Sequence, residues 1–437
     1  MFIVPARARA ITWALPMLVG VGISVSTDTA AAPLTLAAAQ RIAVARSQSV
    51  VAQDAAVAAA REMAVAAGQL PDPVATLGIN NLPINGPDAW STTADFMTMR
   101  SVGLMQEITR ADKREARAER FEREADRSLA EKQAAIVTIE RATALVWIDR
   151  YYVESMAAVL SEMRQAASAE VDAAESAYRA GRGNLADVLA ARGAVAALDD
   201  RASEYRRRVS TTRIALARYV GDEATEPLAG KPDIDRLELD PRIFAGDLAH
   251  HPEMAVLAQK EAVAAAEVKL AQANKKADWS VALMYSQRGP AYSNMVSLNF
   301  SIPLQWDQGN RQDREVAAKL ALLDQARAER EDMLRAHVAE IRTQYVEWES
   351  DRERYSRYER ELIPLASERT QAALAAYRGA KASLPDVLVA RRSELDLKLQ
   401  ALELELDTAR LWAQLSFLDP SDNDTAGPAM RHGKELP

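Results

Sequence analysis

The sequence predicts a mainly α-helical fold with internal duplication, in which very long helices carry two short β-hairpins. Three observations predict it: a sixteen-residue segment recurs in the second half, each copy ends a stretch long enough for an unusually long helix, and two pairs of short segments alternate apolar with polar residues. The 437 residues are 49% hydrophobic but only 5% aromatic. Such a composition suits long helices packed along their lengths rather than one globular core.

The repeated segment is Ala177-Tyr-Arg-Ala-Gly-Arg-Gly-Asn-Leu-Ala-Asp-Val-Leu-Ala-Ala-Arg192, which returns as Ala376-Tyr-Arg-Gly-Ala-Lys-Ala-Ser-Leu-Pro-Asp-Val-Leu-Val-Ala-Arg391. Nine of the sixteen positions match, and seven of these matches are not alanine, the residue that would match most often by chance in this chain. An internal repeat of this kind indicates a duplicated architecture. We therefore expect two equivalent helix-to-helix turns.

The N-terminal residues 1–31 read as an export signal. Arg7 and Arg9 precede an apolar run at 11–25, and small residues follow at 30–32. The alternative is a membrane anchor, but the run is short for a spanning helix and is interrupted by Pro16 and Gly20. The remaining chain divides by element order. We expect a first structural repeat at 32–220, a linking segment at 221–247, a second repeat at 248–418 and a disordered tail at 419–437.

Each repeat contains a helix, a β-hairpin, a very long helix, the repeated turn and a return helix. The expected ranges are 34–68, 74–82, 96–108, 110–178 and 185–219 in the first repeat, and 249–276, 279–288, 294–304, 310–377 and 384–417 in the second. At 1.5 Å rise per residue the long helices reach roughly 100 Å. Val146, Val153 and Leu160 recur with a heptad period, and the last helix has several such rows. A helix that is apolar on several sides must contact several neighbours, which a ring of helices allows.

The second hairpin alternates most clearly. Val296, Leu298 and Phe300 fall on one face, and Ser297 and Asn299 fall on the other. A strand of a transmembrane barrel requires this pattern, because one face meets lipid and the other a polar lumen. An ordinary half-buried hairpin produces the same alternation, so the pattern alone leaves both interpretations open.

The export signal, the doubled helices and two tryptophans favour the barrel. Trp279 and Trp306 fall at one end of the second hairpin, where an interfacial aromatic girdle would lie. Arg100 interrupts the apolar row of the first hairpin. Four strands cannot close a barrel, and lipid does not tolerate an open sheet edge. The predicted fold is therefore a trimeric α-helical barrel of coiled-coil helices, joined to a transmembrane β-barrel with four strands per chain.

This combination resembles the outer-membrane efflux protein family, often called TolC-like. The resemblance rests on the duplicated element order, on two turns with the pattern Tyr-x-x-(Gly/Ala)-x-x-x-Leu-x-Asp-Val-Leu, and on Ile302-Pro303-Leu304 before Asp307-Gln-Gly-Asn-Arg311. It implies a homotrimer in the cell outer membrane, with a large periplasmic part, that exports substrate passively. It also implies two partners, a periplasmic membrane-fusion adaptor protein and an inner-membrane resistance-nodulation-division pump. Residues 70–83 are similar to members that serve heavy-metal efflux (Cus/Czc-type) pumps, so we expect metal cations as substrate.

In that family the two turns are periplasmic tips, where the adaptor docks and the tunnel narrows. The resemblance assigns docking to Gly181, Gly183, Asn184, Leu185, Gly379, Ser383 and Leu384. We expect the glycines to adopt backbone angles that a helix cannot continue through. An acidic ring at the pore entrance maps onto Asp386, with Asp187 as its counterpart, but a second acid found in some members is Val389 here. The alternative is that Asp386 is only a helix N-terminal charge favoured by the macrodipole.

No residue pattern indicates an enzyme or a cofactor site. Nucleotide-binding and zinc-protease motifs are absent. The chain has no cysteine, which rules out disulfides and thiolate metal sites. A net charge of −8, without a basic cluster interleaved with aromatics, argues against nucleic-acid binding.

A few residues suggest metal chemistry or a buried charge. His250 and His251 precede Pro252, and we expect them to begin a helix rather than to bind a metal. Met97, Met99 and Met105 could be soft copper ligands, but we expect them to fill a strand face. Asp149 interrupts an apolar heptad row and should face the tunnel or a buried arginine.

Two further functions stay open. One is an outer-membrane channel for drug efflux or type I secretion. The other belongs to another class, a structural periplasmic coiled-coil protein without a pore. The alternating strands favour a channel over the coiled-coil protein.

Overall fold

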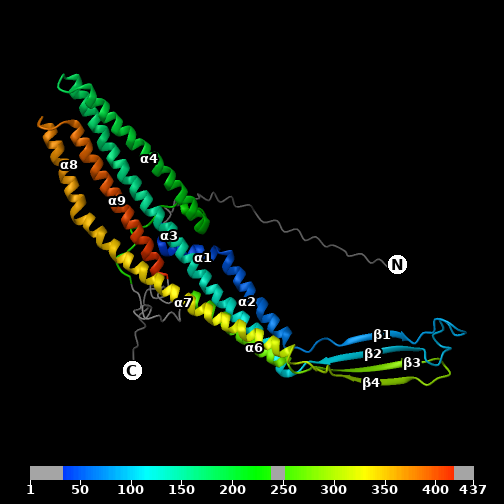
Figure 1. The fold of residues 1–437 in the computed structure, drawn as a ribbon. Helices are drawn as coiled ribbons and strands as arrows, with labels where there is room; N and C mark the ends of the chain where they lie inside the picture. The colour runs from blue at the N-terminus through cyan, green and yellow to red at the C-terminus, as the bar shows by residue number, and fades with distance from the viewer. Residues whose placement is uncertain (1–32, 238–250, 418–437) are drawn as a thin grey trace, which may run out of the picture.

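The computed structural model describes residues 33–237 and 251–417, so the predicted signal segment and tail lie outside the described residues. The chain is elongated, with helices running side by side over most of its length and a sheet projecting from one end (Figure 1). In chain order the elements are α1 (Leu36–Arg46), α2 (Gln48–Ala67), β1 (Val74–Asn80), β2 (Met99–Ile108), α3 (Ala111–Arg179), α4 (Leu185–Val220), η1 (Gly221–Thr225), α6 (Pro252–Asn274), β3 (Trp279–Gln287), β4 (Met295–Ser301), α7 (Gln312–Arg357), η2 (Tyr358–Leu362), α8 (Ile363–Arg378) and α9 (Leu384–Ser416).

Helix α3 sets the scale of the molecule. It runs without interruption for 69 residues, which corresponds to roughly 100 Å. Its heptad residues Val153, Met156 and Leu160 are buried, as their spacing predicted. Within the described ranges, no helix combines the length and the apolar content needed to cross a membrane.

The first predicted helix, 34–68, is two helices, because the chain is extended at Ser47. There φ is −72° and ψ is 116°, and the Ser47 hydroxyl accepts a hydrogen bond from the N–H of Val50 at 3.4 Å. A short hydroxyl side chain suits this position because it satisfies an N–H that has no partner within the helix. As a result α1 packs on α3 and α4, while α2 runs along α3 toward the sheet (Figure 1).

The second long helix, predicted over 310–377, contains a π-helical turn. Helix α7 ends at Arg357, and the widened turn η2 precedes α8. Pro364 lies in the first turn of α8 and has no N–H, so the regular hydrogen-bond ladder is interrupted just before it. Figure 1 shows that the direction of the helix changes between α7 and α8. Both helices pack against α9.

The strands form one antiparallel sheet in the order β1-β2-β3-β4. Pairing of β2 with β3 joins the two hairpins, with Ile108 opposite Trp279 and Arg100 opposite Gln287. Strands β1 and β4 are the edges, and every residue in both is exposed. A single chain therefore leaves two sheet edges with unpaired backbone groups.

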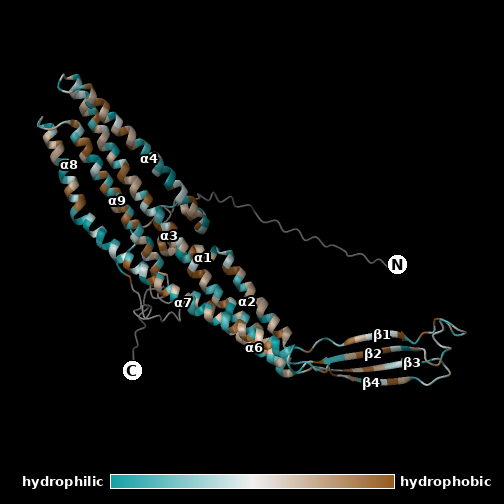
Figure 2. Ribbon diagram, in the orientation of Figure 1, coloured by the Kyte–Doolittle hydropathy of each residue, from teal (hydrophilic) through white to brown (hydrophobic). Residues whose placement is uncertain are grey.

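One face of the sheet is apolar. Directly paired residues of antiparallel strands share a face, and the register aligns Leu77, Val102, Tyr285 and Val296 across the sheet. Further apolar members of this face are Ile79, Leu104, Ile108, Trp279, Val281, Leu283, Leu298 and Phe300. Three polar residues, Arg100, Gln106 and Gln287, lie on the same face. Figure 2 shows that no helix covers the strands.

The opposite face is mostly polar or small. Thr76, Gly103, Met284 and Ser297 form one row across it. Other members are Gly78, Asn80, Met99, Ser101, Met105, Glu107, Ser280, Ala282, Ser286, Met295, Asn299 and Ser301. The predicted alternation is therefore clear in the second hairpin, whereas in the first Arg100 and Gln106 interrupt the apolar face and Val74 lies on the polar face.

The main buried cluster lies where the N-terminal segment and the linking segment cross α3. The indole N–H of Trp147 donates to the carbonyl of Leu34 at 3.1 Å. Arg150, only 1% exposed, donates to the carbonyls of Ala224 and Glu226, both at 2.8 Å. A buried guanidinium needs such acceptors. These bonds fix the described part of the linking segment to the middle of the longest helix.

Helix α9 is buried on several sides, as its several apolar rows predicted. It packs against α3, α7 and α8, and Leu395, Leu399 and Leu406 are buried. Asp149 of α3 accepts a hydrogen bond from Arg410 of α9 at 2.8 Å. Asp149 therefore pairs with an arginine, but this arginine is partly exposed and not buried as the sequence predicted.

Candidate functional site at the helical tips

The two repeated turns lie at the end of the molecule that is opposite to the sheet (Figure 1). One turn joins α3 to α4 and the other joins α8 to α9. A small buried cluster contains Ala174 and Val188 from the first hairpin and Leu384 and Val387 from the second. The tips are therefore packed together by apolar contacts. They are not two independent ends.

Glycine is needed twice in the first turn, for different reasons. Gly181 has φ of 69°, in the left-handed region where glycine avoids a steric penalty. A Cβ on Gly183 would lie 3.2 Å from the Cβ of Ala177 and 3.2 Å from the backbone nitrogen of Tyr178. The turn then passes to Asn184, whose side-chain oxygen accepts from the N–H of Asp187 at 2.8 Å and so caps α4.

The second turn corrects one expectation about glycine. Gly379 has φ of −83°, which any residue adopts, and the left-handed residue is Ala380 with φ of 55°. In the sequence repeat Ala380 corresponds to Gly181. The N–H of Lys381 donates to the carbonyl of Ala376 at 2.8 Å, which matches the bond from Arg182 in the first turn. The second turn thus has the same backbone hydrogen bond as the first, although alanine replaces glycine at the left-handed position.

Asp386 is held by the residue that begins its helix. Its carboxylate accepts from the Ser383 hydroxyl at 2.6 Å and from the Ser383 backbone N–H at 3.0 Å. These two hydrogen bonds lower the pKa of the exposed Asp386 carboxyl below its ordinary value of 3.8. Asp386 is therefore a helix-capping carboxylate, which agrees with the helix-terminus interpretation and leaves a further role in a pore to be tested.

The two leucines that begin the return helices are not equivalent. Leu384 is 1% exposed and belongs to the cluster between the hairpins, whereas Leu185 is 52% exposed. Of these two leucines, only Leu185 is exposed at the tip of a single chain. Four cationic side chains surround the turns and are exposed, namely Arg179, Arg182, Arg378 and Lys381.

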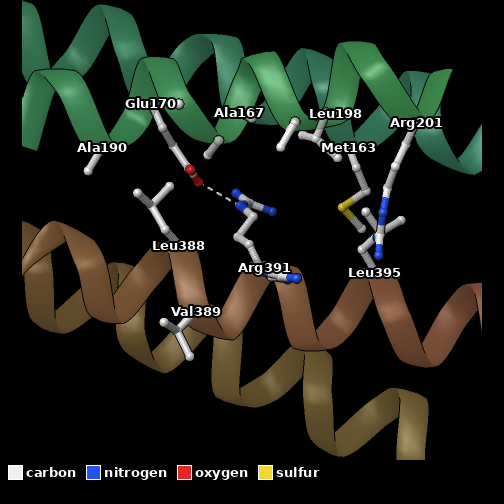
Figure 3. Close-up of a pocket in the computed structure, with 14 residues that line it drawn as sticks. Met163, Ala167, Glu170, Ala190, Leu198, Arg201, Leu388, Val389, Arg391 and Leu395 are labelled. Atoms are coloured by element: carbon white, nitrogen blue, oxygen red, sulfur yellow. Dashed lines mark hydrogen bonds and ion pairs between the residues drawn. The ribbon is translucent and has the colours of Figure 1, made fainter. Parts of the chain in front are cut away.

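A groove of about 410 Å³ separates the two hairpins just behind the tips. Met163, Ala167, Ala190, Leu198, Leu388 and Leu395 are among the residues that line it. Glu170 of α3 and Arg391 of α9 reach toward each other across this groove and form an ion pair (Figure 3). Arg201 of α4 and Asp396 of α9 form a second pair across it, at 2.7 Å.

The sequence analysis missed these pairs, although the repeat contained a signal. Arg391 and Arg192 are the last matched positions of the repeat. Arg192 pairs with Glu175 at 2.6 Å within the first hairpin, whereas Arg391 pairs with Glu170 of the other hairpin. The arginine at this position of the repeat therefore has two roles. Arg192 stabilises the first hairpin internally, and Arg391 joins the second hairpin to the first.

The two tryptophans lie at the other end of the molecule. Trp279 begins β3 and is 40% exposed, and Trp306, between β4 and α7, is 88% exposed. Nearby, Lys113 of α3 pairs with Asp278 at 2.7 Å and so ties the root of the sheet to the helices. Both indoles therefore lie where the sheet joins the helical body.

No protein-family model and no curated protein matches the chain in sequence. Solved structures do match it in fold. The outer membrane protein VceC from Vibrio cholerae aligns with a TM-score of 0.68 and 20% identity, over 86% of this chain and 96% of its own. The outer membrane channel CmeC from Campylobacter jejuni aligns with a TM-score of 0.71 and 14% identity, over 89% of this chain and 87% of its own.

CusC, whose structures concern folding and transmembrane channel formation, aligns with a TM-score of 0.72 and 16% identity, over 87% of this chain and 92% of its own. These alignments span nearly whole chains at low identity. The chain therefore has the fold of the TolC-like outer-membrane channels, as the sequence resemblance predicted. Membership of the heavy-metal branch is a separate question, which the fold does not address.

Proposed function

We propose that the chain is the subunit of a trimeric outer-membrane channel, through which a tripartite efflux system exports its substrate passively. The observation that carries the proposal is the sheet. It has one apolar face that no helix covers and two unpaired edges. Lipid can cover such a face, but it cannot satisfy the edges. Further copies of the same sheet can, because β4 of one chain can pair with β1 of the next.

Three copies supply twelve strands, and the same symmetry arranges the helices around a tunnel. The length of α3 supports a long periplasmic extension, since roughly 100 Å is far more than the thickness of a bilayer. The helices then carry the passage from the membrane to the tips. We propose the aromatic girdle, Trp279 and Trp306, at the periplasmic membrane interface.

The tips are the proposed docking surface for a membrane-fusion adaptor, which links the channel to an inner-membrane pump. Leu185 offers exposed apolar area, and Arg179, Arg182, Arg378 and Lys381 offer positive charge. We therefore expect the contacting surface of the adaptor to carry acidic side chains beside an apolar pocket. Gly183 and Ser383, two of the other assigned docking residues, shape the turns that present these side chains.

For the substrate we propose heavy-metal cations. Four methionines, Met99, Met105, Met284 and Met295, share the polar face of the sheet, which is the lumen face in the proposed barrel. Thioether sulfur is a soft ligand that suits Cu(I) and Ag(I). Weak sites of this kind would favour passage without trapping the ion. Asp386 adds a carboxylate near the proposed entrance.

A susceptibility panel tests the substrate class. A deletion strain should become sensitive to copper and silver, and the wild-type gene should restore resistance. A variant with all four lumen methionines changed to leucine should restore drug resistance, if any is lost, but not copper or silver resistance. Met63→Leu, on the exposed surface of α2, is the matched control. Sensitivity to drugs alone would support a drug-efflux channel instead.

A further inference from the structure

Two histidines far apart in sequence meet where α6 begins. His251 is the N-cap of α6 and His337 lies in the middle of α7. Their Nε2 atoms are 3.0 Å apart, and their side chains are buried, with residues 5% and 8% exposed. Glu253 offers a carboxylate oxygen to the same place, and the three ligand atoms lie within 4.8 Å of one another.

The local structure explains why the rings converge. Pro252 follows His251 and disfavours helical angles there, so His251 is extended with φ of −68° and ψ of 125°. Met254, three residues on, and Ile341, four residues after His337, belong to one buried cluster. Residues three or four apart share a helix face. The histidines therefore lie one turn beyond a packed contact between α6 and α7.

Two carboxylates near the rings fit a cation. Glu340 of α7 lies 3.8 Å from Nδ1 of His337, on the side of the ring that is remote from His251. Metal-bound histidines usually have a carboxylate or carbonyl acceptor in that position. Glu253 is also 3.7 Å from Arg141 of α3, and its side chain is 45% exposed. The site thus has buried nitrogen ligands and one carboxylate that reaches solvent, which leaves a path for an ion.

The ligand set indicates which ion would bind. Two imidazole nitrogens bound to one tetrahedral ion at about 2.0 Å are separated by roughly 3.3 Å, close to the separation found here. Imidazole and carboxylate together suit Zn²⁺ and other borderline divalent ions of the first transition row. Mg²⁺ and Ca²⁺ prefer all-oxygen ligands and fit the set poorly.

We propose that His251, His337 and Glu253 form a resident binding site for a divalent transition-metal ion, such as Zn²⁺, with solvent completing the coordination. The ion joins the first turn of α6 to α7. The start of the second helical repeat is thereby clamped to its own long helix. The site lies in the helical body, away from the tips and the sheet, and does not depend on the channel function.

The site can be tested on purified, detergent-solubilised protein that has been stripped with a chelator. Calorimetric titration with Zn²⁺ should give one ion per chain. His251→Ala and His337→Ala should each weaken binding by more than about 100-fold, which exceeds the loss expected from an outer partner. Glu253→Gln should weaken it strongly, and Glu340→Gln by about tenfold. Glu261→Gln, which removes a carboxylate of α6 that pairs with Arg327 instead, is the control and should bind Zn²⁺ like the unaltered chain.

A second measurement covers the possibility that a variant fails to fold. Co²⁺ bound to the unaltered protein should show the visible absorption of a nitrogen- and oxygen-ligated tetrahedral site, and Zn²⁺ should displace it. A simple hydrogen bond between the two rings predicts neither signal. Absence of Zn²⁺ binding to the unaltered protein would overturn the proposal, and so would a folded His337→Ala protein that binds Zn²⁺ as tightly.

Discussion

At the scale of single residues, Ala380 stands out because it has a backbone conformation that glycine adopts more easily. Its φ is 55°, and glycine occupies the corresponding position of the first turn. An L-residue in this region costs about 1 kcal/mol relative to glycine. We expect Ala380→Gly to stabilise the tip of the second hairpin by about that amount and Gly181→Ala to destabilise the first tip. Hydrogen exchange of the tip amides measures both changes.

Gly193 provides the control for this prediction. It lies within α4, and a Cβ there would meet nothing within 4 Å. Gly193→Ala should therefore strengthen its helix by about 0.5 to 1 kcal/mol. If Gly181→Ala and Gly193→Ala change protection in the same direction, the argument from the left-handed conformation is wrong.

Asp386 makes a prediction about pH. Its folded-state pKa is lowered by the hydrogen bonds from Ser383. A group of this kind stabilises the fold above its ordinary pKa, and the contribution is lost as pH falls through the lowered value. In planar bilayers we expect the channel's cation preference to persist from about pH 7 to about pH 5. Asp386→Ala should reduce that preference at both values.

Repulsion among three Asp386 carboxylates in a trimer would act in the opposite direction and raise the pKa. Loss of selectivity already above about pH 5 would therefore show that the carboxylates lie close together and outweigh the cap. Selectivity that is unchanged in Asp386→Ala would leave the residue with its capping role alone.

At the scale of elements, the two faces of the sheet predict opposite responses to charge. Leu298 belongs to the apolar face and Asn299 to the polar face of β4. Leu298→Arg should impair membrane assembly, because a cation in the hydrocarbon costs roughly 2–4 kcal/mol near the midplane. Asn299→Arg should assemble normally. The amount of each variant recovered in the outer-membrane fraction measures its assembly. Equal losses of the two variants from that fraction would contradict a lipid-facing apolar face.

The pair between hairpins predicts a gating effect. Arg391 holds α9 to Glu170 of α3, and Glu170 is buried. Removing one partner of a buried pair costs about 3 kcal/mol, because the other charge stays unpaired. We expect Arg391→Met to loosen the hairpins at the tips and to raise single-channel conductance. Arg192→Met removes the corresponding pair within one hairpin and should leave conductance near that of the unaltered channel.

Some elements could be predicted from the sequence and others could not. The long helices and the strand faces were predicted because periodicity is a local property, carried by residues such as Val153 and Leu298. The break at Ser47 was missed because it depends on one side-chain hydrogen bond, and the π-helical turn because Pro364 interrupts a strongly helical pattern without ending it. The meeting of His251 with His337 could not be predicted, because only the packing of α6 on α7 brings the two together.

For the whole molecule, closure of the barrel predicts the assembly. The exposed edges β1 and β4 require partners, and three chains supply twelve strands. Cross-linking in native outer membranes should therefore give a trimer, and the purified trimer should resist detergent until it is heated. A chain recovered only as a monomer, or only in the periplasm, would contradict the channel and favour a coiled-coil protein without a pore.

The pairing of β2 with β3 has a consequence for biogenesis. Ile108 lies opposite Trp279, so the sheet is completed only after most of the chain has emerged. Contacts between such distant residues form slowly, because a long loop must close first. During that interval an apolar hairpin is present without its neighbour, in a state prone to aggregation. The first hairpin should therefore need a holding chaperone in the cell until β3 and β4 have been synthesised.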